Sequence, residues 1–158
     1  MKNRIERLKL AVLLLTVNFL AGHSKAGKPT GFADAYKSKI KLHTMRENYE
    51  YWAAKVEKIN AGKMELSIRQ WAGKPYNSNQ SELDRLQHVH LQRFEMYWYK
   101  SQREKGELPT VCIDGKLYTD VKTLAANDGL ELEDWLEWFF KKKETVSGCI
   151  IHFTDFKY

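Results

Sequence analysis

Three side chains with the chemistry of a base, a nucleophile and an anion clamp lie within six residues of this sequence. They are Lys41, Thr44 and Arg46, with His43 between the first two. A neutral lysine amine can accept a proton, a threonine hydroxyl can attack a carbonyl carbon, and a guanidinium can hold an anionic oxygen. This set would suffice to open a small amide or ester, with His43 and Arg46 contacting the substrate. It would equally suffice to grip a phosphate.

Two conditions decide between these uses. Lys41 can activate a hydroxyl only when it is neutral, which requires its pKa to fall from about 10.4 to about 7, a bias of about 4–5 kcal/mol. Repulsion from Lys39 and Arg46, together with burial, could supply it. Residues three apart on a strand point to opposite faces, so Lys41 and Thr44 cooperate only on a turn or loop. Otherwise Lys41 and Arg46 are solvated charges and Thr44 pairs with backbone.

The charge is distributed unevenly along the 158 residues, which we take as one domain, 1–158. Residues 1–80 carry 15 Lys and Arg against 6 Asp and Glu, whereas residues 81–158 carry 11 against 14. A basic half attracts phosphates and nucleic acid. The alternative is an ordinary, moderately basic surface.

The two cysteines, Cys112 and Cys149, show no CxxC spacing, which excludes a zinc knuckle or a redox motif of that type. Two buried thiols in a reducing compartment are favoured over one disulfide, so we expect a cytoplasmic protein.

The N-terminus allows two interpretations. The basic stretch Met1–Lys9 and the apolar stretch Leu10–Gly22 have the form of a secretory signal, too short to span a bilayer. We favour a buried first strand over Val12–Phe19, because no small-x-small cleavage site follows Ala21. Residues 1–11 then form a basic extension that need not be ordered. A secreted protein with a cleaved leader is the remaining alternative.

Periodicity and turn residues predict a mixed α+β chain. We expect helices over Phe32–Ile40, Glu47–Asn60 and Leu132–Phe139, strands over Met64–Trp71, Gln87–Tyr99 and Gly148–Thr154, and a hairpin over Val111–Tyr118 that turns at Asp114–Gly115. A change of phase near Gln92–Arg93 predicts a bulge. This pattern fits a small curved sheet or a partly open barrel.

A basic and aromatic patch is expected after the first of these long strands. Arg69, Trp71, Lys74 and Tyr76 could stack a base and hold phosphates, and stacking is worth about 1–3 kcal/mol per base. Alternatively, Trp71 closes one end of the barrel.

The histidines give no metal site. His88 and His90 would share one face of a strand, but no third ligand lies at short spacing, so we expect surface histidines and predict no metal and no cofactor. His152, in the last strand, is expected to be structural.

The run Lys41-x-x-Thr44-x-Arg46 resembles the signature of the ASCH domain superfamily, Gly-x-Lys-x-x-(Glu or Thr)-x-Arg. The order of the elements is also similar to that family from about residue 13 to the last residue. Further segments resemble a bacterial and phage branch, namely Leu66–Tyr76, Asn127–Leu130 and Ile151–Tyr158. The family glycine is replaced by Lys39, so the turn before Lys41 is expected to differ.

The resemblance implies a PUA-like fold, a small curved β-barrel of about five or six strands with short flanking helices. It also implies RNA or a modified nucleoside as the partner, and no membrane. One bacterial member is an amidohydrolase that removes acetate from acetylcytidine with the motif Lys, the motif Thr and a later Glu. Carried over, Lys41 and Thr44 match directly, and Asp128 stands near the place of the later carboxylate, where it would position water.

The chain is therefore expected to be a candidate amidohydrolase or, alternatively, a non-catalytic RNA-binding module. The module would use Lys25, Lys28, Arg69 and Lys74 against the phosphate backbone. The oligomeric state does not follow from the sequence.

Overall fold

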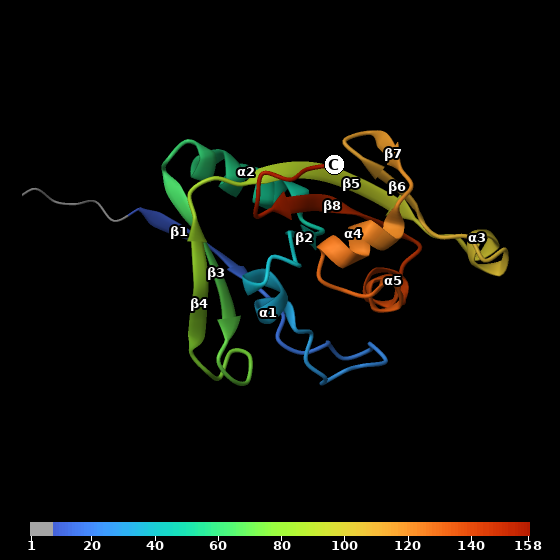
Figure 1. Ribbon diagram of the computed structural model, residues 1–158, viewed down its shortest axis with the longest axis horizontal. Coiled ribbons are helices and arrows are strands. Elements are labelled where there is room, and N and C mark those ends of the chain that lie inside the picture. Colours follow the sequence, from blue (N-terminus) through green and yellow to red (C-terminus); the bar gives the residue numbers. More distant parts are fainter. Residues whose placement is uncertain (1–7) are drawn as a thin grey trace, which may run out of the picture.

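The computed structural model describes residues 8–158 and shows a mixed α+β fold, as predicted (Figure 1). The strands are β1 (Lys9–Leu14), β2 (His43–Arg46), β3 (Met64–Trp71), β4 (Gln80–Leu86), β5 (His90–Tyr97), β6 (Thr110–Ile113), β7 (Lys116–Tyr118) and β8 (Thr145–His152). The helices are α1 (Phe32–Lys37), α2 (Tyr49–Asn60), α3 (Lys100–Glu104), α4 (Val121–Asn127) and α5 (Leu132–Phe140). None of the helices in this part of the chain is long and apolar enough to cross a membrane.

The strands form two sheets, and neither closes on itself. One has the order β1-β3-β4 and the other β2-β8-β5-β6-β7. In Figure 1 the smaller sheet lies at the left and β5 and β8 of the larger sheet cross the upper part of the view, with α1 at the lower centre and α4 and α5 below β8. Across residues 8–158 the eight strands exceed the expected five or six, and no closed barrel is formed.

β1 begins earlier and ends sooner than the expected strand over Val12–Phe19. It pairs in parallel with β3 from Lys9 to Leu14, with Ala11 and Leu13 facing the core. Residues 9–11, which were assigned to a basic extension, are therefore part of the sheet. Residues 1–7 of that extension lie outside the described residues.

β5 contains no bulge, so the prediction at Gln92–Arg93 is wrong. Its pairing with β8 runs without interruption from His90 opposite His152 to Tyr97 opposite Thr145. The change of phase has another cause: the polar side chain of Gln92 points into the core and accepts a hydrogen bond from His152 Nε2 at 2.9 Å. The register shift lies instead in the pairing of β3 with β4, where Ile68 is opposite Asp84 and Arg69 is opposite Glu82.

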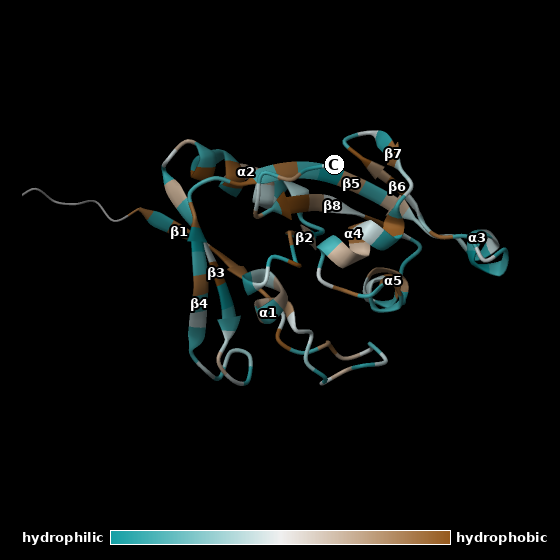
Figure 2. Cartoon of the chain, viewed as in Figure 1, coloured by the Kyte–Doolittle hydropathy of each residue, from teal (hydrophilic) through white to brown (hydrophobic). Residues whose placement is uncertain are grey.

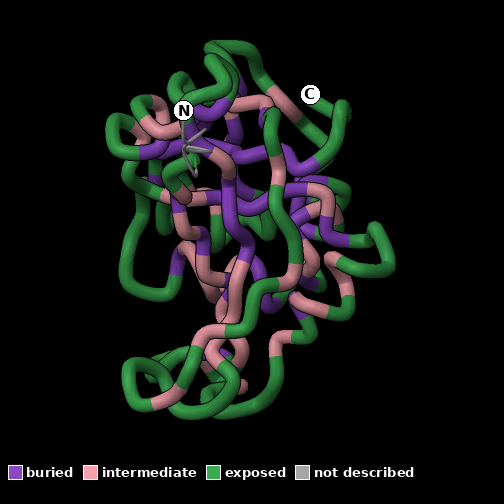
Figure 3. The backbone as a smooth tube through the Cα atoms, turned by 90° about the vertical axis from the view of Figure 1, so that its left-hand side faces the viewer, coloured by how far each residue is buried: buried purple, intermediate pink, exposed green. Residues whose placement is uncertain are grey.

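The predicted helices and the hairpin are confirmed, except that the first helix ends at Lys37 and not at Ile40, because the left-handed backbone of Lys39 stops it. In α2, Trp52, Val56 and Ile59 form one buried stripe. At the hairpin, Asp114 and Gly115 have φ angles of 51° and 78°, as a two-residue turn requires. In Figure 2 hydrophobic segments occur along β5 and β8, and Figure 3 shows buried positions at the centre and exposed positions on the connecting loops.

Both cysteines are free thiols on the larger sheet. Cys149 on β8 is buried, Cys112 on β6 is half-buried, and β5 runs between their strands. Burial raises the pKa of the Cys149 thiol to about 12, which leaves it protonated and unreactive at neutral pH.

Gly148 is required where β8 passes the end of β2. A Cβ atom there would overlap Arg46 O and lie 2.6 Å from Glu47 Cα, both of them backbone atoms that cannot rotate away. The glycine thus allows the motif strand to lie against the central strand.

We predict that Gly148→Ala destabilises the fold by at least about 3 kcal/mol, because backbone must move to admit the methyl group. Urea denaturation monitored by circular dichroism measures this loss. Gly106→Ala is the control: Gly106 has a φ of 72° with nothing near its Cβ position, so only about 1 kcal/mol should be lost. Equal losses in the two variants would contradict the role given to Gly148.

Candidate functional site

The motif spans the end of a loop and the short strand β2. Lys41 lies just before the strand, whereas Thr44 and Arg46 lie on it. Backbone hydrogen bonds fix this segment on both sides: Lys41 N donates to Ala35 O on α1, and Leu42 N donates to Asn127 O on α4. Because Lys41 precedes the strand, the alternation that would separate it from Thr44 does not apply.

The turn before Lys41 keeps the conformation that glycine favours, although the sequence has Lys39 there. Lys39 has a φ of 60°. Its amide donates to Tyr36 O and the next amide, of Ile40, donates to Ala35 O, which is the Schellman arrangement that ends a helix. The left-handed backbone costs an L-residue about 1–2 kcal/mol.

Lys41, Thr44, Arg46 and Asp128 all line one cavity of about 200 Å³, which we term the motif cavity. The rest of its lining is mostly apolar. The other lining residues are Leu15, Thr16, Leu20, Phe32, Met45, Leu130, Trp138 and Phe139.

Lys41 and Asp128 form a buried ion pair. Their exposed fractions are 3% and 4%, and Lys41 Nζ donates to Asp128 Oδ1 at 3.1 Å and to Asp128 O at 2.5 Å. The ammonium also lies 4.2 Å from the centre of the Phe32 ring. Asp128 was expected to position water, but it is paired with the lysine instead.

Burial lowers the pKa of Lys41, and the positive charge of Arg46 lowers it further, while Asp128 opposes both. For Asp128, burial raises the pKa of the carboxyl, but Lys41 and His43 outweigh burial and hold it below its usual range. The site therefore combines an ionised carboxylate with an amine that releases its proton more readily than an exposed lysine.

Thr44 and Arg46 share one face of β2, as expected for residues two apart. Arg46 Nε donates to Thr44 Oγ1 at 3.2 Å, and the other end of the guanidinium donates to Leu14 O at 2.7 Å. Among residues 8–158 the Thr44 hydroxyl donates no hydrogen bond, so its proton is free for a base. In the described chain Lys41 Nζ makes no hydrogen bond to Thr44 Oγ1, so the amine and the hydroxyl share the cavity without touching.

Gly129 allows the carboxylate-bearing turn to lie against Lys41. It has a φ of 86°, and a Cβ atom there would lie 3.2 Å from the side-chain carbons of Lys41. The sequence placed Asp128 at the site by resemblance, but it gave no indication of this packing.

His43 does not line the motif cavity, so it cannot contact a substrate there as we expected. It is fully buried behind Asp128, with Nε2 2.7 Å from Tyr158 Oη and Nδ1 3.7 Å from Asp128 Oδ1. Asn127 Nδ2 donates to Tyr158 Oη at 3.0 Å, so the phenol is free to donate its own proton to His43. This assigns the imidazole proton to Nδ1, which faces the carboxylate.

The basic and aromatic patch lies apart from the motif cavity, which none of its four residues lines. Arg69 is held by Ser67 Oγ at 2.8 Å and Gln80 Oε1 at 3.1 Å. The rings of Trp71 and Tyr76 lie 5.3 Å apart at the end of β3, and Tyr76 is 87% exposed. Lys74, in the same loop, is also exposed.

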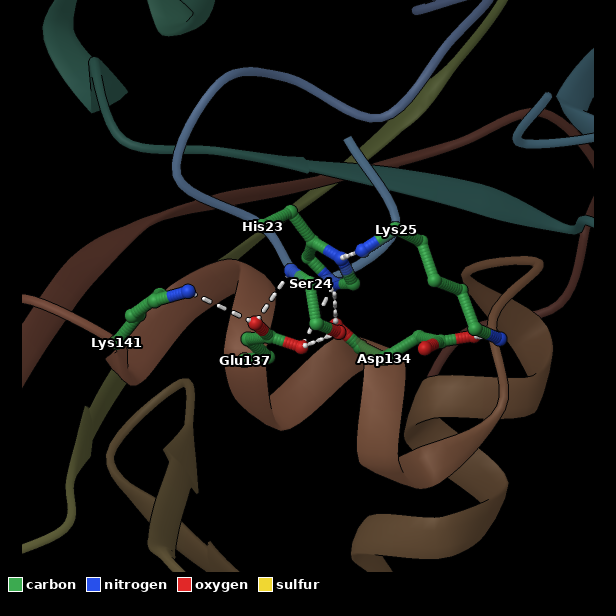
Figure 4. A network of polar contacts seen from close by, with 6 residues as sticks. All are labelled: His23, Ser24, Lys25, Asp134, Glu137 and Lys141. Atoms are coloured by element: carbon green, nitrogen blue, oxygen red, sulfur yellow. Dashed lines mark hydrogen bonds and ion pairs between the residues drawn. The ribbon is translucent and has the colours of Figure 1, made fainter. Parts of the chain in front are cut away.

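A network of hydrogen bonds and ion pairs, which the sequence did not predict, connects the loop after β1 to α5 (Figure 4). Ser24 N and Oγ both donate to the Glu137 carboxylate at 2.6 Å, and Lys25 Nζ donates to Asp134 Oδ2 at 2.7 Å. His23 Nε2 lies 3.2 Å from Asp134 O. Lys25, expected to meet RNA, is thus already paired, while Lys28 in the same loop is exposed.

His88 and His90 have ring centres 4.9 Å apart, and His90 lies 3.8 Å from Asp155. Over residues 8–158 no group of three or more His, Cys, Asp or Glu side chains is placed to hold a metal ion. His152 is buried on β8 and bound to Gln92, a structural position.

Comparisons with protein-family models, curated proteins and solved structures found no match to this chain. The resemblance to the ASCH superfamily therefore stays a prediction that rests on the motif and the order of elements.

We predict that Lys39→Gly stabilises the protein by about 0.5–1 kcal/mol, because glycine adopts the left-handed backbone without strain and part of the gain is lost to unfolded-state entropy. Thermal denaturation measures this change. Lys37→Gly, two residues earlier at the end of α1, is the control and should destabilise the helix by about 1 kcal/mol. A loss of stability in Lys39→Gly would show that the turn is not formed as described.

We also predict that stability falls as the pH falls from 6.5 to 5. Burial lowers the pKa of His152 to about 3, so the unfolded chain takes up a proton near pH 6.5 that the folded chain refuses. The contribution of His152 to the free energy of unfolding is then fully present above pH 6.5. Below pH 6.5 the free energy of unfolding declines by up to about 1.4 kcal/mol per pH unit. Urea denaturation at stepped pH should show a smaller slope for His152→Gln and an unchanged slope for the exposed-site control His88→Gln. An equal slope in all three proteins would refute this assignment.

Proposed function

We propose that this chain is an ASCH-like protein that binds a modified nucleoside, free or within RNA, in the motif cavity and hydrolyses an acyl amide on its base. One observation carries the proposal: Lys41, Thr44, Arg46 and Asp128 line one cavity although Asp128 is distant in sequence. A volume of about 200 Å³ lies below the ~300–1,000 Å³ of sites for drug-sized ligands, and suits a single base with its acyl group.

In the proposed reaction Thr44 Oγ attacks the amide carbon, and its proton passes to Lys41 Nζ in the neutral form. The carbon–nitrogen bond breaks, the base amine leaves with that proton, and the acyl group remains on Thr44. Water then hydrolyses the ester, returning the hydroxyl and releasing the carboxylic acid. Arg46 holds the oxyanion, while Asp128 holds Lys41 near the hydroxyl.

We further propose that the two sheets are an opened form of the PUA-like barrel. The order of elements supports this: an apolar first strand, a helix, the motif strand β2 and then further strands around the last helices. The retained glycine-type turn at Lys39 supports the same family. Two free thiols and a nucleoside ligand fit a cytoplasmic location.

We predict that the protein releases cytidine and acetate from acetylcytidine, and that Thr44→Ala and Lys41→Ala each slow this release by about 100-fold or more. Liquid chromatography of the reaction mixture measures the cytidine. Thr16→Ala is the control, since Thr16 lines the same cavity without a role in the reaction.

Removing Lys41 leaves Asp128 buried without a partner, so circular dichroism must show that the variant is folded. Thr44→Ser keeps a hydroxyl and should keep a measurable rate. A folded wild-type protein that releases no cytidine, or a Thr44→Ala variant as active as wild type, would exclude the hydrolase.

A binding module without turnover is the second candidate. It is favoured by the pairing of Lys41 with Asp128 and by the missing hydrogen bond to Thr44, because a salt-bridged ammonium is a poor base. Here a single-stranded RNA should bind with an affinity that falls steeply with salt, with a log–log slope of about −0.7 for each phosphate contacted. Salt-independent RNA binding would exclude this candidate.

A further inference from the structure

We infer that a phosphate subsite lies beside the motif cavity, between Arg46 and Lys142, and that the preferred ligand is a nucleotide with a terminal phosphate. The nucleoside part of this inference rests on the proposed function, whereas the phosphate part rests on a second cavity and its uncompensated charges.

The second cavity, which we term the outer cavity, has a volume of about 370 Å³. It shares Leu20, Met45, Arg46, Trp138 and Phe139 with the motif cavity, so the two are adjacent and have a common wall. A ligand with its base in the motif cavity can therefore extend past Arg46 into the outer one.

The net charge of the outer cavity depends on which of its lysines are paired with a carboxylate. Lys141 Nζ lies 3.1 Å from Glu137, and Lys143 Nζ lies 2.6 Å from Glu47. These two pairs use both acidic residues of the lining. Of the four Lys and Arg residues that line it, Lys142 and Arg46 have no carboxylate within 4.0 Å in the described chain.

Arg46 has only neutral partners. Its guanidinium donates to the carbonyl of Leu14 and the hydroxyl of Thr44, while Asp128, whose charge acts on Arg46, is bound to Lys41. A guanidinium has five N–H donors in a planar fork that matches phosphate oxygens, so several remain for a ligand. Lys142 supplies a second charge next to Gly22. Its Nζ lies 3.8 Å from the position that a Cβ atom would take on Gly22.

The two free positive charges match the charge of a phosphomonoester, which is about −1.5 to −2 at neutral pH. A phosphodiester carries one charge and would leave one cation uncompensated. The apolar common wall of Trp138 and Phe139 offers a surface for the sugar and the base between the two polar ends. The outer cavity thus selects a terminal phosphate attached to the nucleoside held by the motif.

Isothermal titration calorimetry of the full chain with cytidine and with cytidine 5′-monophosphate tests this inference. We expect the monophosphate to bind at least about tenfold more tightly, as for hydrogen bonds to a charged group. Lys142→Gln should remove most of this difference and leave cytidine binding unchanged. Lys58→Gln, which removes the same charge on the exposed side of α2, should change neither affinity.

Two further titrations identify the source of the phosphate. A tetraribonucleotide with a 5′-phosphate, bound more tightly than its 5′-hydroxyl form, would assign the subsite to an RNA end. A preference shown only by the mononucleotide would assign it to free nucleotides.

Equal affinities of the wild-type protein for cytidine and its monophosphate would overturn the subsite and leave the proposed function intact. A preference that survives in Lys142→Gln would also overturn it, as would the absence of binding by both ligands. Preference for the monophosphate that depends on Lys142, without release of cytidine from acetylcytidine, would support the subsite and reject the hydrolase.

Discussion

The buried ion pair between Lys41 and Asp128 is the interaction on which the rest of the site depends. It joins the loop before β2 to the end of α4, two segments far apart in sequence. Removing one partner of such a pair typically costs about 3–5 kcal/mol, because the other charge is left buried and uncompensated. The pair therefore fixes where the lysine amine lies relative to Thr44, and it does so by a contact that no local sequence pattern encodes.

The same burial that makes this pair structural also makes the amine chemically useful. Desolvation disfavours the ammonium form, and Arg46 adds repulsion, so the pKa of Lys41 lies below that of an exposed lysine. Asp128 keeps the amine in place, and His43, held by Tyr158, presents its second nitrogen to the carboxylate from behind. The ion pair holds the lysine in place, but it also stabilises the protonated form of the amine. A ligand that displaced Asp128 from Lys41 would remove this stabilisation and lower the pKa of Lys41 further.

Local patterns predicted α2, α5 and the hairpin at Asp114–Gly115, because helical stripes and positive-φ turn residues act over a few residues. The sequence did not predict β4, whose exposed Gln80–Leu86 segment has no apolar face to reveal it. The buried Gln92 imitated a bulge, since a polar residue on an inward face breaks the alternation although the strand is continuous. At the site, the motif residues were found from their side-chain chemistry and spacing and Asp128 by resemblance, whereas the cavity wall of Phe32 and Trp138 comes from long-range packing. The place of His43 followed from neither, because His43, Thr44 and Met45 are all buried, and the sequence does not show which face of β2 borders the cavity.

The proton affinity of Lys41 is the most direct test of this account. Nuclear magnetic resonance of protein labelled at the lysine side chains, with the Lys41 signal assigned from a Lys41→Arg variant, can follow its titration together with that of exposed Lys58. The account predicts a midpoint for Lys41 clearly below that of Lys58. A midpoint equal to or above that of Lys58 would show that the ion pair holds the lysine as a fixed cation, which would contradict its proposed role as a base.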